Sequence, residues 1–400
     1  MKRFSFVIPT YQGKVLVKNT LEALNHQAGY GRDDYEVILV DDGSTDGTGE
    51  YIKGINKNYD LKYIYIERTG ESCRAGARNR GWMAADGEYI VFIDGDILVK
   101  EDYLKELDRY YSVDTDILVI GNRVMLSEDV PYEVVCDRAA MKKQICRINK
   151  GSQMEARYYK FYRFSYNASL LNYPWLNVFS CNMAVPKKWL EYTGGFDENF
   201  TGWGLEDIEV GYNVYKAGVK IVVNSKLEVF HQNHPGSDTL KVSRKKYKDI
   251  DKNASYFLKK HPDAFNIPEK IIYKLLKGLT QIDMVPRQTL MCRRVTLDFK
   301  DRKSLCSFKN TITELSGQKG IKLKIIDYLE DTDLDIWVQL LGRRASTPQY
   351  IPVSKRKDFR RLKGPVGLLL FRCLIAQKAL IAMFRACLNS GGGSLDSVRQ

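Results

Sequence analysis

The sequence predicts an α/β protein with a mostly parallel sheet flanked by helices, followed by a smaller C-terminal α+β or helical region. Two observations carry this prediction. In the first part of the chain, short apolar runs alternate with segments of helical spacing, a pattern typical of strands that helices connect within a parallel sheet. The apolar runs are also continuous rather than alternating, as expected of strands that are buried on both faces.

The expected elements follow one another regularly up to residue 125, and the apolar run at 36–44 ends in turn residues. We expect strands at 4–11, 36–44, 62–67, 88–96 and 116–125. We expect helices at 17–27, 46–55, 73–87 and 101–111, the third of them closed by Gly87. Ligands of such sheets bind outside the carboxyl ends of the strands. The polar segments at 9–11, 41–44 and 94–96 should therefore lie along one rim.

The second part of the chain is less regular. Residues 178–200 predict a strand, a turn and a helix, residues 206–218 a helix that stops at Gly218, and residues 219–233 an extended segment ending at His231. Further on, 293–300, 322–329 and 335–341 are strand candidates around a helix near 305–316. We expect these domains: 1–255 catalytic, 256–289 a helical linker, 290–390 an accessory α+β or helical region, and 391–400 a flexible tail.

The charge and the apolar segments restrict the class of protein. The net charge of +13 favours an acidic partner such as nucleic acid, an anionic membrane face or a phosphorylated substrate, although a generally basic surface explains it equally well. The most apolar segment, 364–388, is interrupted by four polar or charged residues. We therefore expect a packed or membrane-surface helix there, not a transmembrane one. The start lacks the apolar stretch of a signal peptide, and the eight cysteines form no C-x-x-C pair, so we expect a cytoplasmic protein with reduced thiols.

The segment "DGD" at 94–96 ends an apolar run. Residues two apart in a strand point to the same side, so Asp94 and Asp96 are expected to direct two carboxylates at one spot, with Gly95 allowing a tight turn. Two oxygen ligands and a diphosphate would suit Mg²⁺ or Mn²⁺. A solvated turn is the simpler reading of this motif alone. Likewise, Asp42 in "VDDGSTDGT" either accepts a hydrogen bond from a base or ribose, or belongs to an Asx turn before a helix.

The stretch "TGGFDENFTGWGLEDIEVG" at 193–211 combines glycines, aromatic residues and an acidic helix start. Trp203, beside Gly204, can stack on a sugar ring. Glu206 and Asp207 near a helix N-terminus are stabilised as anions, and one of them can act as a general base toward an acceptor hydroxyl. A well-capped helix with an acidic first turn explains the same residues. His231, at the end of an apolar run, is a candidate nitrogen ligand that would favour Mn²⁺, or an ordinary core or surface residue.

Taken in order, these motifs resemble the inverting glycosyltransferases of family 2, which have the GT-A, Rossmann-like fold of nucleotide-diphospho-sugar transferases. Four segments of this chain resemble the donor-binding half of that family: "FSFVIPTYQGK", "EVILVDDGSTDGT", "AGARNRG" and "EYIVFIDGD". The half around 181–238 is similar to chondroitin-polymerase and β-1,4-galactosyltransferase modules. The resemblance covers about residues 3 to 240, and residues 256–400 have no family match. Walker-type, G-x-G-x-x-G, H-E-x-x-H and G-x-S-x-G motifs are absent from the sequence.

The resemblance implies a role for each matching residue. Donor binding falls to Pro9, Thr10, Tyr11, Asp42, Arg78, Asp94 and Gly95, of which Pro9, Tyr11 and Asp42 would hold uracil and ribose. The metal, Mn²⁺ or Mg²⁺, would bind to Asp96 and His231. Trp203, Gly204 and Glu206 would bind the acceptor, and Asp207 would be the general base.

We therefore predict a metal-dependent enzyme that transfers a sugar from a UDP-sugar to a glycan or lipid-linked glycan, with a peptide modified at Ser, Thr or Cys as the alternative acceptor. No nucleic-acid partner is expected. The basic C-terminal region leaves a peripheral contact with the inner membrane face open. A nucleotidyltransferase is less favoured because "PTYQGKVLVK" has a single glycine. A non-catalytic binding scaffold is less favoured because Asp96, Asp207 and His231 are all present.

Overall fold

The structure is a computed structural model that describes residues 2–148, 164–235, 244–276, 293–330, 333–342 and 348–353, together with 153–155, 157, 160 and 161. Within these residues, no helix is long and apolar enough to cross a membrane. The apolar segment 364–388 and the expected tail at 391–400 lie outside the described residues.

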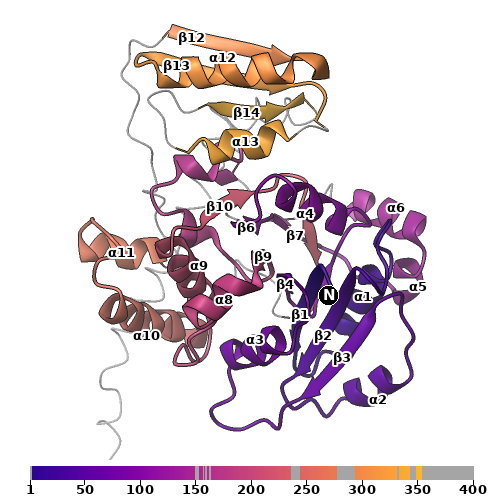
Figure 1. Cartoon of the computed structure of the whole chain (residues 1–400). Helices are drawn as coiled ribbons and strands as arrows, with labels where there is room; N and C mark the ends of the chain where they lie inside the picture. The colour runs from indigo at the N-terminus through magenta and orange to yellow at the C-terminus, as the bar shows by residue number, and fades with distance from the viewer. Residues whose placement is uncertain are drawn as a thin grey trace, which may run out of the picture.

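A seven-stranded sheet forms the centre of the described part of the molecule (Figure 1). Its strands, in spatial order, are β10 (Lys220–Val223), β6 (Ile117–Ile120), β9 (Asn182–Pro186), β4 (Tyr89–Ile93), β1 (Phe4–Thr10), β2 (Tyr35–Asp41) and β3 (Asp60–Tyr65). Only β9 runs antiparallel to its neighbours. The predicted α/β fold with a mostly parallel sheet is therefore confirmed.

Two apolar cores cover the two faces of this sheet. The first core contains residues of α3 (Arg74–Met83), α8 (Lys187–Thr193), α9 (Glu206–Lys216), α10 (Arg244–Lys260) and α11 (Glu269–Leu276). The second contains residues of α1 (Lys14–Leu24), α2 (Thr48–Lys53), α4 (Tyr103–Tyr111), α5 (Tyr132–Val135) and α6 (Arg138–Ile148). Short 3-10 helices, η1 (Ala168–Leu170) and η2 (Pro174–Asn177), precede β9. The expected domain boundary at 255 falls inside α10, which packs on the first core.

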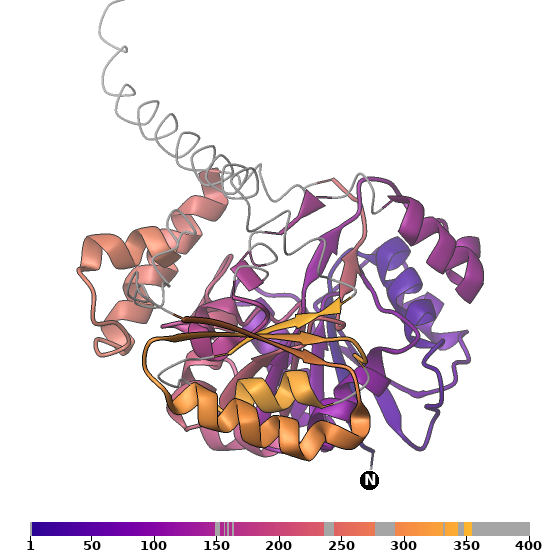
Figure 2. The same ribbon diagram turned by 90° about the horizontal axis from the view of Figure 1, so that it is seen from above.

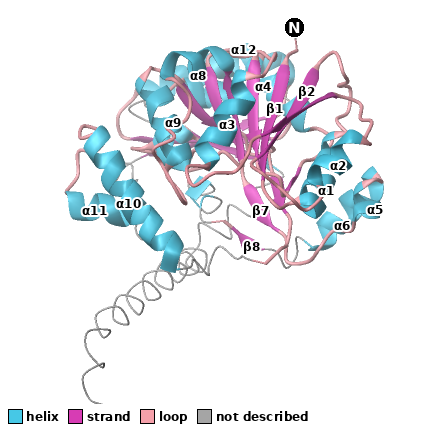
Figure 3. Cartoon of the chain, turned by 90° about the horizontal axis from the view of Figure 1, so that it is seen from below, coloured by secondary structure: helices cyan, strands magenta, loops and turns pink. Residues whose placement is uncertain are grey.

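A second, four-stranded sheet lies beyond the end of the central one (Figure 3). It consists of β5 (Ile97–Leu98), β11 (Val229–His231), β7 (Arg123–Met125) and β8 (Gln153–Met154), in this order. The strand predicted at 116–125 is therefore two strands, β6 and β7, in different sheets. The chain bends at Gly121, where an added Cβ would lie 1.9 Å from the carbonyl oxygen of Leu227. The segment at 219–233 divides in the same way into β10 and β11.

The C-terminal unit lies beside the β10 edge of the central sheet (Figures 1 and 2). It has a parallel sheet of β12 (Arg293–Phe299), β13 (Ile321–Asp327) and β14 (Gln349–Pro352), with η3 (Arg302–Ser304), α12 (Leu305–Gly317) and α13 (Leu334–Leu340). Gln339 of α13 accepts a hydrogen bond from the Val223 N–H (2.8 Å) and donates one to the Val223 carbonyl (2.9 Å). Arg109 of α4 donates two hydrogen bonds to Asp335, of 2.9 and 3.0 Å.

Three further predictions about single elements are wrong. The strand predicted at 335–341 is the helix α13, and β14 was not predicted. The helix predicted at 73–87 ends at Met83, because Gly87 packs directly on β1, where a Cβ would lie 2.5 Å from the Ser5 hydroxyl. No turn separates β9 from α8, since Pro186 both ends the strand and precedes the helix.

Candidate active site

The polar residues that follow β1, β2 and β4 lie at one edge of the central sheet, as the sequence predicts. Thr10 pairs with Asp41 at the ends of β1 and β2, and the Asp42 N–H donates to the Thr10 carbonyl oxygen (2.9 Å). Since β4 runs parallel to β1, the "DGD" segment emerges at the same edge. This edge therefore brings together the residues expected to bind a donor.

Tyr11 and Asp42 form one surface of the site. The Tyr11 ring is 48% exposed, and the Arg68 guanidinium lies 3.9 Å from the ring centroid. Arg68 also forms an ion pair with Asp42. The sequence analysis did not identify Arg68, because nothing in its local sequence indicates that it would contact two expected donor-binding residues.

The "DGD" segment forms a turn in which the Ile97 N–H donates to the Asp94 carbonyl oxygen (3.2 Å). Gly95 packs closely on β1, since a Cβ would lie 3.2 Å from the Pro9 carbonyl oxygen. Because the turn interrupts the strand, the two carboxylates contact different groups. Asp94 pairs with Arg78 (3.0 Å), and Asp96 lies against two histidines. The prediction that both carboxylates point at one spot is therefore wrong.

Asp96, His231 and His234 form a group that could hold a metal ion, with one ligand atom from each lying within 4.8 Å of the others. Each histidine Nε2 lies 3.2 Å from Asp96 Oδ2. Pairing of β11 with β5 places His231 opposite Ile97, and the Gln232 N–H donates to the Asp96 carbonyl oxygen (2.9 Å). The fold thus brings together Asp96 and His231, which the sequence analysis selected, and adds His234, which it did not.

The electrostatics of this group are set by a carboxylate that lies between two histidines. Burial raises the pKa of Asp96, but the hydrogen bonds and the charges of the two histidines outweigh burial and lower it well below its usual range. The hydrogen bond to Asp96 raises the pKa of His234. Asp96 Oδ1 is buried and has no hydrogen-bond partner among the described residues. A carboxylate with one free buried oxygen beside two imidazoles is a donor set that suits Mn²⁺ better than Mg²⁺.

On the other side of the turn, Arg78 joins Asp94 to the start of α9. Its side chain is 3% exposed, and its guanidinium pairs with Asp94 (3.0 Å) and with Glu206 (3.2 Å). The charges of Asp94 and Glu206 more than offset burial and raise the pKa of Arg78. The expected contact of Arg78 with a nucleotide stays a prediction, because the described contacts give it the role of holding two carboxylates in place.

Asp207, the expected base, is partly buried next to Glu206. Its Oδ2 accepts a hydrogen bond from the Ser180 N–H (3.3 Å) and its Oδ1 one from the Ile208 N–H (2.8 Å). Burial and the neighbouring Glu206 carboxylate raise the pKa of Asp207 to about 7, against the opposing effects of Arg78 and of the two N–H groups. A carboxylate that titrates near neutral pH has the basicity that general-base catalysis needs.

The glycine-rich loop before α9 has a special backbone. Gly202, Gly204 and Leu205 all have positive φ angles, of 78°, 94° and 75°, which is costly for leucine. Trp203 is partly buried, and Lys246 Nζ of α10 lies 5.2 Å from the centroid of its ring. The loop therefore presents an aromatic ring beside the two acidic residues that begin α9.

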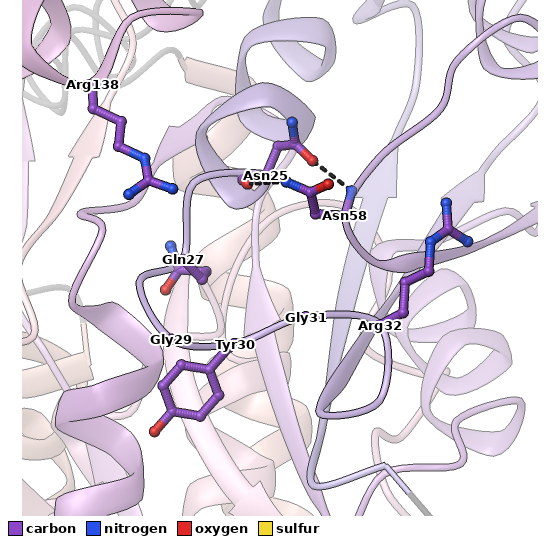
Figure 4. A pocket seen from close by; sticks show the side chains of 8 residues that line it. All are labelled: Asn25, Gln27, Gly29, Tyr30, Gly31, Arg32, Asn58 and Arg138. Atoms are coloured by element: carbon purple, nitrogen blue, oxygen red, sulfur yellow. Dashed lines mark hydrogen bonds between the residues drawn. The ribbon is translucent and has the colours of Figure 1, made fainter.

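A separate surface hollow lies at the opposite side of the fold from this edge, before the N-terminal ends of β2 and β3 (Figure 4). Its volume is about 560 Å³, and it is lined by Asn25, Gln27, Gly29, Tyr30, Gly31, Arg32, Asn58 and Arg138. None of the predicted site residues lines it. We therefore place the candidate active site at the carboxyl ends of the strands.

Two models of known families match parts of the chain. Residues 5–190 match the model described as glycosyl transferase family 2. The chain contains a family 2 glycosyltransferase domain. Residues 161–235 match the model described as the N-terminal domain of galactosyltransferase. Asp42, Asp94 and Asp96 lie in the family 2 match, and the acidic start of α9 with the two histidines lies in the second.

Relatives of known name are similar to much of this chain. Validoxylamine A glucosyltransferase of Streptomyces hygroscopicus subsp. jinggangensis is 28% identical over 270 residues, which are 66% of this chain and 62% of the relative. Chondroitin synthase of Escherichia coli is 30% identical over 293 residues, which are 70% of this chain and 41% of the relative. The matched part of the chain thus spans 62% or less of the length of these relatives.

Solved structures of similar shape include Staphylococcus aureus TarS 1–349 in complex with UDP-GlcNAc. It has a TM-score of 0.47 and 19% sequence identity, over 69% of this chain and 71% of that chain. A mannosyltransferase from Pyrobaculum calidifontis in complex with GDP-Man and Mn²⁺ has a TM-score of 0.48 and 18% identity, over 69% of this chain and 70% of that chain.

Proposed function

We propose that the protein is a divalent-metal-dependent, inverting glycosyltransferase that moves a sugar from a UDP-sugar to a hydroxyl group of a glycan. One observation carries the proposal. A single turn, at 94–97, joins the Asp96–histidine group on one side to the Asp94–Arg78–Glu206 chain on the other, and the expected base Asp207 follows Glu206 directly. A metal site for a diphosphate and a base for an acceptor would thereby be held at a fixed spacing.

Asp96, His231 and His234 would hold the metal. The unpartnered buried oxygen of Asp96 and the two imidazoles fit a divalent ion, and Mn²⁺ accepts such nitrogen ligands more readily than Mg²⁺ does. When bound, the ion would neutralise negative charge on the departing diphosphate. His234 extends the ligand pair predicted from the sequence to three.

The donor would bind along the strand ends. Tyr11 offers an exposed ring face for a base, and Asp42 offers a carboxylate for a base or ribose donor. Arg68 contacts both of these side chains, so it belongs to the same surface. Asp94, partly exposed and paired with Arg78, would meet the ribose or the sugar.

Asp207 would take the proton from the acceptor hydroxyl group as its oxygen attacks the anomeric carbon. The new C–O bond forms on one face of the sugar while the bond to the phosphate oxygen breaks on the other, so the configuration inverts and UDP leaves. Glu206, held by Arg78, would orient the acceptor, and the ring of Trp203 would lie against a sugar. The match to a chondroitin synthase favours a glycan acceptor over a peptide.

The test is UDP release by the full chain with a panel of UDP-sugars, with oligosaccharide acceptors, and with or without EDTA. We expect release from at least one donor that requires both acceptor and metal. The variant Asp207→Asn should keep metal-dependent UDP binding and lose transfer. Tight UDP binding by the wild type without release from any donor would instead support a non-catalytic binding protein. Formation of a UDP-sugar from UTP and a sugar phosphate would indicate a nucleotidyltransferase.

A further inference from the structure

A buried cluster of charged residues lies behind the candidate base and has no role in the function proposed above. It consists of Glu155, Arg157 and Lys160, with 5%, 4% and 8% of their surfaces exposed. Charged side chains are rarely buried this completely unless they are paired. Arg157 and Lys160 of this cluster both contact Asn177, in the segment that precedes β9. These contacts show which part of the chain the cluster holds.

Arg157 is fixed at one end and holds a backbone segment at the other. Its Nε donates to Glu155 Oε1 (2.8 Å), and its Nη1 donates to the Asn177 carbonyl oxygen (2.7 Å). Its guanidinium also lies 4.1 Å from the centroid of the Phe179 ring. Lys160 Nζ donates to the side-chain oxygen of Asn177 (3.0 Å). The segment from 177 to 179 is thus held by two buried cations.

The same segment carries the N–H group that binds the candidate base. Ser180 lies in a turn that the Asn182 N–H closes on the Phe179 carbonyl oxygen (3.1 Å), and the Ser180 N–H donates to Asp207 Oδ2 (3.3 Å). After the turn, the Asn182 side chain donates to the Asn122 and Leu227 carbonyl oxygens (3.0 and 2.8 Å). Ser180 therefore lies between Asn182, whose side chain is hydrogen-bonded to two neighbouring segments, and Asn177, whose carbonyl oxygen is held by Arg157.

Glu155 connects Arg157 to β7, the strand beside the one that carries His231. Besides Arg157, it receives the Arg123 N–H (3.2 Å) and pairs with the Arg123 guanidinium (3.3 Å). Arg123 begins β7, the strand that runs beside β11 with His231. Through Glu155 and Arg157, the position of Ser180 is tied to the strand pair that carries the metal-site histidine.

We propose that Arg157 is a positioning residue for sugar transfer, because it fixes the segment whose Ser180 N–H group orients Asp207. This inference rests on the proposed function and adds to it a residue that touches neither substrate nor metal. An N–H group that donates to a carboxylate favours its charged form. The other charges that face Asp207, those of Glu206 on α9 and of Arg78 on α3, stay in place when Arg157 is changed.

The test compares R157M and R157K with the wild type and with R109M, whose arginine forms the similarly paired contact to Asp335 away from the site. For R157M we expect kcat to fall about 10- to 100-fold, the cost of misplacing a reacting group slightly, while KM for the UDP-sugar stays within about twofold. The acid limb of the kcat–pH profile should move to higher pH.

R157K keeps the charge but cannot donate to Glu155 and Asn177 at once, so it should show the same changes to a smaller degree. R109M should lower stability and leave the profile in place.

The proposal is overturned if folded R157M and R157K have the kcat–pH profile of the wild type, whatever their stability. If R157M does not fold, R157K decides alone. A wild type that binds UDP and transfers no sugar would reject the proposed function instead. In that case the pH dependence of unfolding still tests the link to Asp207. The stabilising effect of Asp207→Asn at pH 8 should be larger in the R157K background than in the wild type, and an equal effect would overturn the proposal.

Discussion

Replacement of Asp207 by asparagine should remove activity and stabilise the fold at the same time. Asparagine keeps the shape of the side chain and an oxygen that can accept a backbone N–H, but it cannot take a proton. Loss of a general base lowers rates by about 10²- to 10⁴-fold, so we expect a fall in kcat of this size. Metal-dependent UDP binding should change little, because Asp207 lies outside the Asp96–histidine group.

The stability effect follows from the raised pKa. At about 1.4 kcal/mol for each pH unit, a rise in pKa from the ordinary 3.8 to about 7 means that the charged form costs the folded state about 4 kcal/mol. This is an upper estimate, because Asp207 is only partly buried. A group whose folded pKa is raised binds its proton more tightly in the folded state. The cost is therefore absent below pH 4, grows between pH 4 and 7, and is complete above pH 7.

Two measurements check this reasoning. Urea unfolding of the wild type and of Asp207→Asn should give equal free energies near pH 4 and a more stable variant at pH 8. The kcat of the wild type should be about half its maximum near pH 7 and about one tenth at pH 6, since the base must be unprotonated. If the variant gains no stability between pH 4 and pH 8, Asp207 has an ordinary pKa and the account of its environment is wrong.

Three further predictions concern the metal group and the fold. Asp96→Ala should abolish the increase in UDP affinity that Mn²⁺ causes in isothermal titration, and an unchanged increase would place the metal elsewhere. His234→Ala should weaken the metal-dependent UDP affinity by at least the 10- to 100-fold that loss of an outer-shell partner costs; affinity equal to that of the wild type would remove His234 from the site. Gly121→Ala should lower the free energy of unfolding by about 1–3 kcal/mol or more, because its Cβ would lie 1.9 Å from the Leu227 carbonyl oxygen, and a neutral effect in urea unfolding would contradict the tight packing.

The sequence predicts the central sheet well because strands such as β4 and β6 are continuous apolar runs. The same signal misleads at α13, which was predicted as a strand. Leu334 and Val338 pack into the C-terminal core, while Ile336 packs into a core of the central sheet. A short helix that is buried on two sides has apolar residues on both faces, so periodicity cannot distinguish it from a buried strand. The break at Gly121 was missed because the close contact that requires it comes from a distant residue, Leu227.

The candidate site was predicted only in part, because some of its contacts join residues that are distant in sequence. Asp94, Asp96, Asp207 and His231 belong to motifs that can be seen in the sequence. His234 lies three residues after His231, and this spacing was the only local signal for it. Arg68 contacts Asp42 and Arg157 contacts Asn177, which lie elsewhere in the sequence, so nothing in the neighbourhood of either arginine indicates these contacts.

The contact between Gln339 and Val223 has a consequence for how the protein behaves if it is shortened. The side-chain amide of Gln339 accepts from the N–H and donates to the carbonyl oxygen of the same residue, Val223, as a neighbouring strand would, so the outer edge of β10 is closed to pairing at its last residue. Open strand edges are templates on which other chains add by hydrogen bonding. Removing the residues after 290 would uncover this edge, and the remaining domain would then be prone to self-association through its outermost strand.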